Sequence, residues 1–221
     1  KIFPFVIALT IIFLGYGFFS GFFNSPKDYQ QGNLVRIMYV HVPSAWMALM
    51  VYSSIAIASC VFLINKHLLA NIYCKACSPI GACFTLIAII TGSIWGKPAW
   101  GTWWVWDARI TSMVILFFLY LGHISIYNFS ENTNRAGQAA SILAILGFIN
   151  IPIIKFSVDW WNTLHQPASV IKLSGPTIHS SMLIPLLVTA LGFFFYFLVV
   201  LIIRMRSEIT NEKINNLSFT E

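Results

Sequence analysis

The chain of 221 residues contains 58% hydrophobic residues and only 9% charged residues, whereas a soluble domain carries about 25% charged residues. Its mean hydropathy is +0.78, and its 13 basic and 7 acidic side chains are too few to cover a water-facing surface, which excludes a soluble fold. The net charge of +6 does not indicate nucleic-acid binding, because the basic residues punctuate apolar runs, as membrane-edge anchors do.

Six segments that lack Asp, Glu, Lys and Arg predict six transmembrane helices, because about 20 apolar residues cross a hydrocarbon core of about 30 Å. The predicted helices cover residues 3–23, 42–64, 78–94, 110–129, 136–154 and 181–203. A membrane β-barrel is disfavoured, since its strands would alternate apolar and polar residues. We therefore expect an all-α integral membrane protein that forms a single six-helix domain over residues 1–221.

The first segment is predicted to stay as a helix, because its apolar stretch exceeds a signal-peptide core and no small-residue cleavage site follows it. Six spans put both termini on one side, which holds seven basic residues against six on the other side. The positive-inside rule then favours cytoplasmic termini. The loops after the first, third and fifth spans share the opposite face, which receives seven of the eight Trp residues.

The connection between the third and fourth spans is rich in tryptophan, with five Trp in residues 95–109. An aromatic belt at the membrane surface is the simpler explanation, but a belt would spread its Trp over both faces. Pro98 and Gly101 predict a helix that begins near Pro98 and presents Trp100, Trp103, Trp104 and Asp107 on one side. Such a shelf of indoles suits stacking against a large planar ligand.

Two histidines, His41 and His165, flank this shelf at the same membrane surface. A lone interfacial His is more often a satisfied polar side chain than a ligand, but a planar ligand carrying a metal would use neutral imidazoles above and below its plane. Basic residues on the same face, which could neutralise carboxylates of such a ligand or contact lipid headgroups, are Arg36, Lys97, Arg109 and Lys172. His179 is a reserve ligand, and His67 and His123 are predicted to be structural.

The four cysteines give a weaker signal. Cys74 and Cys77 have the spacing of a redox motif or half a zinc site, but no His follows for covalent haem attachment and no second pair completes a metal site. Cys60 and Cys83 lie in predicted spans and are interpreted as apolar fillers. Free thiols are therefore expected.

Three runs carry a resemblance to a known family: WGKPAWGTWWVWDARITS at 95–112, MYVHVPSAW around His41 and WWNTLHQPAS around His165. Together they resemble the cytochrome c maturation protein C family, which handles haem with a tryptophan-rich periplasmic domain. The resemblance implies a protein of the bacterial or mitochondrial inner membrane that holds haem b as bound substrate at the periplasmic surface and delivers it to a haem chaperone. It implies that His41 and His165 are axial ligands or orienting groups at the iron. The remaining residues that it implicates are Trp95, Trp100, Trp103, Trp104, Trp106 and Asp107 in a tryptophan-rich platform at about 95–112, and Arg109 and Arg36 at the haem propionates.

The resemblance also implies partners: the haem chaperone, a small single-span accessory protein, and the ATPase and permease subunits of an ABC transporter. The chain has no phosphate-binding glycine loop, so an ATP-driven step would occur on a partner. Haem delivery or a lyase-like transfer is expected in place of conventional enzyme chemistry. The alternative function, a haem or solute permease subunit of an export complex, is disfavoured by the few polar residues along the spans. A quinone redox enzyme is disfavoured because pairs of haem-ligating His within spans are missing from the sequence.

Overall fold

The computed structural model describes residues 2–130, 132–167, 169–170, 172 and 175–218. Its α-helices are α1 (Ile2–Phe19), α2 (Met38–Asn65), α3 (Leu68–Trp100), α4 (Ala108–Phe129), α5 (Thr133–Gly147), α6 (Asn150–Trp160) and α7 (Ser180–Ser218), with short helical turns η1 (Ser20–Asn24) and η2 (Asn33–Ile37). Six helical stretches are long and apolar enough to cross a membrane, with α5 and α6 forming one of them. The predicted all-α fold with six spanning helices is confirmed.

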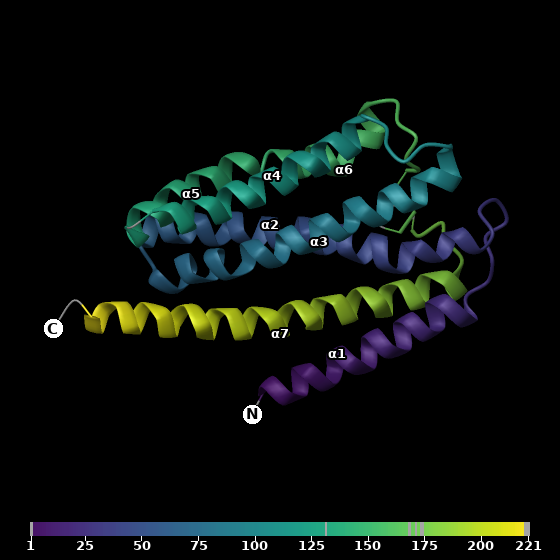
Figure 1. Ribbon diagram of the computed structural model, residues 1–221. Coiled ribbons are helices and arrows are strands. Elements are labelled where there is room, and N and C mark those ends of the chain that lie inside the picture. Colours follow the sequence, from purple (N-terminus) through teal and green to yellow (C-terminus); the bar gives the residue numbers. More distant parts are fainter. Residues whose placement is uncertain (1, 131, 168, 171, 173–174, 219–221) are drawn as a thin grey trace.

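The helices form an elongated bundle in which α2 and α3 occupy the middle (Figure 1). Helices α4, α5 and α6 cover one side of this central pair, and α7 with α1 covers the other. The connections that follow α1, α3 and α6 gather at one end of the bundle (Figure 1). Segments that are far apart in the sequence therefore meet at this end.

The core lies where α2, α3 and α4 meet, and it is built around two fully buried tyrosines. Tyr52 and Tyr120 pack edge to face with their ring centroids 5.1 Å apart, and the Tyr120 hydroxyl donates a hydrogen bond to the carbonyl of Ala48 at 2.7 Å. Gly81 faces the Tyr120 ring so closely that a Cβ would overlap it. This packing fixes the central helices that carry the site.

The predicted span 136–154 is two helices, with a break after Gly147. Pro152 has no backbone N–H, and proline is tolerated within the first turn of a helix, so a new helix begins at Asn150. The Asn150 side chain donates to the carbonyl of Ser112 at 2.8 Å, which fastens the break to α4. Helix α6 then continues to Trp160, well past the predicted end.

Helices α3 and α7 are longer than predicted, because charged residues that bounded the predicted spans are paired within the bundle. Lys75 Nζ lies 2.7 Å from Glu208 Oε2, and Arg204 Nε donates to the carbonyl of Ala76 at 3.0 Å. The 33 residues of α3 extend roughly 50 Å at 1.5 Å per residue. Helix α3 therefore projects beyond a hydrocarbon core of about 30 Å.

Candidate functional site

His41 lies in the first turn of α2 and contacts α3. Its Nδ1 is 3.1 Å from Thr91 Oγ1, and the Thr91 hydroxyl is 2.6 Å from the carbonyl of Ile87. Since the hydroxyl donates its only hydrogen to that carbonyl, its oxygen accepts from His41 Nδ1–H. The ring of Trp95 packs edge to face on His41 with centroids 5.7 Å apart. The Nε2 atom of His41 is left with its lone pair.

His165 follows α6 and is bonded to the start of α4. Its Nδ1 lies 2.9 Å from Asp107 Oδ2, and the two side chains are only 18% and 6% exposed. The other oxygen of Asp107 accepts from the backbone N–H of Ile110 at 2.8 Å, so Asp107 is the N-cap of α4. Trp100 packs against the His165 ring with centroids 4.8 Å apart. The N-terminus of α4 and the loop after α6 are thus held together by one carboxylate.

The charge state of this pair follows from burial and hydrogen bonding. Burial raises the pKa of Asp107, but hydrogen bonds from the Ile110 N–H and from His165 outweigh it, and the pKa of Asp107 falls below its usual range. Burial lowers the pKa of His165, and the opposing effect of Asp107 does not restore it. At neutral pH the pair is therefore a carboxylate and a neutral imidazole that donates Nδ1–H to it, with Nε2 unprotonated.

The tryptophan-rich platform is bent, and the prediction of a helix that begins near Pro98 is wrong. Helix α3 continues through Pro98 to Trp100, and Gly101 ends it in the left-handed region with φ 78°, as glycine commonly does after a helix. Residues 101–107 form a connection. The Ser93 hydroxyl donates to the carbonyl of Trp103 at 2.8 Å, which folds this connection back onto α3.

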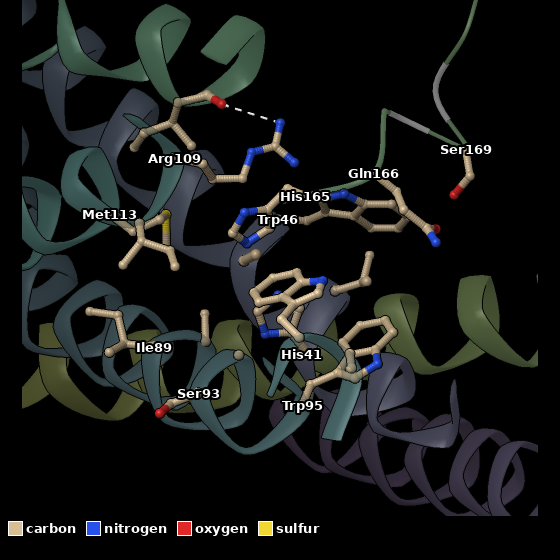
Figure 2. Close-up of a pocket in the computed structure, with 18 of the residues that line it drawn as sticks. His41, Trp46, Ile89, Ser93, Trp95, Arg109, Met113, His165, Gln166 and Ser169 are labelled. Carbon is tan, nitrogen blue, oxygen red and sulfur yellow. Dashed lines mark hydrogen bonds between the residues drawn. The ribbon is translucent and has the colours of Figure 1, made fainter. Parts of the chain in front are cut away.

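A cavity of about 580 Å³ lies between these groups, within the range of about 300–1,000 Å³ of small-molecule sites. Among the predicted site residues, those that line it are His41, His165, Trp95, Trp100, Trp103, Trp104 and Arg109. In Figure 2, His41 and Trp95 approach the cavity from the side opposite to His165 and Arg109. The two histidines thus line one cavity from opposite sides.

Three predicted site residues lie outside this lining. Asp107 stands behind His165, and Trp106 packs on Trp104 with its side chain 72% exposed. Arg36 donates to the carbonyl of Ser25 at 3.1 Å. Arg109 does line the cavity, but its guanidinium donates to groups of α6, which are Ser157 Oγ and the carbonyls of Ile154 and Lys155.

Several lining residues were missed by the sequence analysis, namely Trp46, Gln31, Met113 and Gln166. Trp46 lies in α2 just after His41, and it was overlooked because it falls inside a predicted span. Gln31 precedes η2, and its side-chain oxygen accepts from the Trp95 indole at 2.8 Å. No sequence signal marks Gln31, because its position depends on the fold of the loop after α1.

The donor set fits a planar ligand that carries a metal and carboxylates. Two neutral imidazole nitrogens can bind iron in such a ligand, and indole rings cover apolar ring faces. The buried Trp104 Nε1 has no hydrogen-bond partner within the described part of the chain. A buried N–H without a partner is costly, and a ligand oxygen would satisfy it.

The remaining histidines and the cysteines lie outside the cavity lining. His179 is exposed and its Nδ1 contacts the Ser181 hydroxyl at 2.8 Å. His123 is buried within α4, with Nδ1 2.6 Å from Ser78 Oγ. All four cysteines are free thiols, as expected.

Comparison with known proteins gives a consistent result. The family model of CcmC, described as Heme exporter protein C, matches residues 1–220. Heme exporter protein C of Bradyrhizobium diazoefficiens is 46% identical over 100% of this chain and 84% of its own length. The protein of the same name from Haemophilus influenzae is 48% identical over 96% of this chain and 86% of its own length. A ccmC-like mitochondrial protein of cytochrome c biosynthesis from Marchantia polymorpha is 54% identical over 77% of this chain and 72% of its own length.

Proposed function

The chain belongs to the Heme exporter protein C family, and from this premise we propose that it binds haem b between His41 and His165 and delivers it to a haem chaperone. The general role, haem handling for cytochrome c biogenesis in a multi-pass membrane protein, follows from the family and the six candidate spans. The haem-binding site between the two histidines and the transfer of haem to the chaperone are what we propose. Haem is treated as cargo, which the protein holds and then releases.

The observation that carries the proposal is the hydrogen bonding of the two imidazoles. Each Nδ1 is bonded to a residue that does not line the cavity, His41 to Thr91 and His165 to Asp107. Each Nε2 is thereby free for iron, as in metal sites where the second ring nitrogen fixes the tautomer. Haem iron takes two axial ligands, and this cavity offers two from different elements.

The shape of the site suits temporary binding. The cavity is lined by Trp103 and Gln166, both exposed at the end of the bundle, so it opens near the surface. Binding energy is limited when part of a ligand stays in contact with water. A carrier must retain haem and still release it, and an open site with an accessible ring edge meets both demands.

The proposal includes a location and partners. We place the termini in the cytoplasm and the cavity at the periplasmic face of a bacterial inner membrane, or its mitochondrial equivalent, in line with the charge distribution. The partners are a haem chaperone, a small single-span accessory protein and the ATPase and permease subunits of an ABC transporter complex. The propionates would contact Arg109, which lines the cavity, with Arg36 a further candidate.

The test is the absorption spectrum and haem content of the purified protein in detergent. We expect a Soret band in the parent that shifts or fades in His41→Ala and in His165→Ala. His179→Ala is the matched control, because His179 directly precedes α7, which begins at the cavity end of the bundle, and lies outside the cavity lining. Normal haem content and normal chaperone loading in the double variant His41→Ala/His165→Ala would contradict the proposal.

The same preparation addresses the alternative, a permease subunit of an export complex. A parent protein that holds no haem, even when co-expressed with its chaperone, would leave the aromatic cavity as a lipid or docking surface. The permease function would then take precedence.

A further inference from the structure

We propose that the two imidazoles are unequal iron ligands: His165 is the retained ligand and His41 is the ligand that leaves when haem passes to its acceptor. Asp107 and Thr91 are the positioning residues that create the difference. This inference rests on the proposed function and deepens it, because it assigns an order to the release of the two ligands. Neither positioning residue lines the cavity itself.

The two histidines share one tautomer. In both, the proton is on Nδ1 and the lone pair is on Nε2, because each Nδ1 faces an oxygen that accepts. The Thr91 hydroxyl donates its hydrogen to the Ile87 carbonyl, and Asp107 presents a carboxylate oxygen to His165 Nδ1. A tautomer change is therefore opposed at both sites.

The two acceptors differ in charge. Asp107 is a carboxylate 2.9 Å from His165 Nδ1, and a hydrogen bond to a carboxylate raises the basicity of a ligating imidazole. Thr91 offers His41 a neutral hydroxyl at 3.1 Å. Charge-assisted hydrogen bonds are roughly twice as strong as neutral ones. His165 is consequently the stronger electron donor at iron, and the bond to His41 is the weaker of the two.

His165 lies on a loop, yet that loop is fixed at the histidine. The backbone N–H of His165 donates to Thr163 Oγ1 at 2.8 Å, and Asp107 joins the imidazole to the N-terminus of α4. Asp107 is almost completely buried, so water competes little for this hydrogen bond. The loop position therefore does not make His165 the weaker ligand.

The release step is a ligand exchange. The bond between iron and His41 Nε2 breaks, and a lone pair of a neutral donor atom of the acceptor occupies the vacated position. Both ligands are neutral, so no proton or electron is transferred. Iron stays bound to His165 until the acceptor holds the haem.

Carbon monoxide is the probe that identifies the ligand that leaves. CO binds ferrous haem in place of one axial ligand, and its stretching frequency reports the ligand on the opposite side of the iron. We expect the CO adduct of the parent to match that of His41→Ala, in which His165 remains, and to differ from that of His165→Ala. A parent adduct that matches His165→Ala, or identical frequencies in both variants, would overturn the inference.

The positioning residues are tested by near-isosteric variants. In Asp107→Asn, asparagine still caps α4, but its amide nitrogen faces His165 Nδ1 and drives the ring proton to Nε2. We expect haem affinity to fall about 10–100-fold, the usual effect of losing an outer-shell partner, and the CO frequency of Asp107→Asn/His41→Ala to shift. Thr91→Val should cause a smaller loss of haem affinity than Asp107→Asn, and Thr91→Ser should retain the parent affinity.

The outcomes separate the two proposals. A parent without haem contradicts the proposed function. Haem that depends on both histidines but is unaffected by Asp107→Asn supports the proposed function and overturns the inequality. If Asp107→Asn lowers the yield of folded protein, the comparison of Thr91→Val with Thr91→Ser and the CO adducts of the single histidine variants still decide the order of release.

Discussion

At the scale of single residues, Gly92 constrains the site because it has no side chain. A Cβ at this position would lie 3.0 Å from Cε1 of His41, so the imidazole would have to shift. His41 borders the cavity, which leaves space for its side chain to shift, and α3 tolerates alanine. The effect of a substitution should therefore fall on the ligand and leave the fold intact.

We predict that Gly92→Ala weakens haem binding without lowering thermal stability. An off-rotamer shift of the imidazole costs about 1 kcal/mol, which corresponds to a roughly fivefold loss of affinity. Haem titration followed by Soret absorbance measures it. Gly15→Ala is the control, because a Cβ at Gly15 meets nothing within 4 Å and should leave haem affinity unchanged. Equal haem affinities in Gly92→Ala and Gly15→Ala would contradict the close approach of Gly92 to His41.

One residue also determines the pH at which haem is released in acid. Iron binds only neutral imidazole, and burial lowers the pKa of His165 below its ordinary value of about 6.5. Protonation of His165 therefore competes with iron binding only at a lower pH than protonation of a free imidazole would. In His41→Ala, which leaves His165 as the imidazole of the cavity, we predict half-release of haem below pH 6.5. Spectra recorded at stepped pH measure it, and half-release above that value would disagree.

At the scale of elements, the tryptophan-rich platform contains several residues that line the cavity and one, Trp106, that does not. Trp100 ends α3, lines the cavity and packs on His165. Trp106 lies on the connection to α4 and is exposed. The two residues belong to one motif, so they make a matched pair.

We predict that Trp100→Ala reduces haem retention and that Trp106→Ala does not. Removing an indole edge from a ligand-bearing cavity costs about 1 kcal/mol or more, and neither side chain belongs to the buried core. Both variants should unfold at the parent temperature. Haem content per mole of purified protein is the measurement, and parent haem content in Trp100→Ala would count against the cavity as the haem site.

The sequence alone predicted some features of these elements and not others. Apolar length predicted every spanning stretch, because lipid demands it. The helix break before Asn150 and the ion pair of Lys75 depend on contacts with other helices. The residue pattern of a single segment does not predict such contacts. The grouping of His41 and His165 at one end followed from the alternation of spans. The bend at Gly101 and the cavity position of Trp46 are tertiary features, and the helical spacing proposed for the platform was wrong for that reason.

At the scale of the whole molecule, the two ends of the bundle differ in chemistry. One end carries the cavity. At the other, Arg206 lies 5.3 Å from the Phe3 ring centroid, which brings the first and last helices together, and Lys75 pairs with Glu208. An even number of spans requires the two termini to share a side, and the contact between Phe3 and Arg206 agrees with that requirement.

We predict that the cavity end faces the periplasm, and epitope insertion can test it. A tag at Gly175, whose positive φ and open surroundings indicate an accessible turn, should bind antibody on intact spheroplasts. A tag at Ser130, between α4 and α5 at the opposite end, should bind only after lysis. Both tagged proteins must retain parent haem content, which excludes misfolding as the cause of exposure. The reverse labelling pattern would place the histidines at the cytoplasmic face, where a periplasmic chaperone has no access to the haem that they hold.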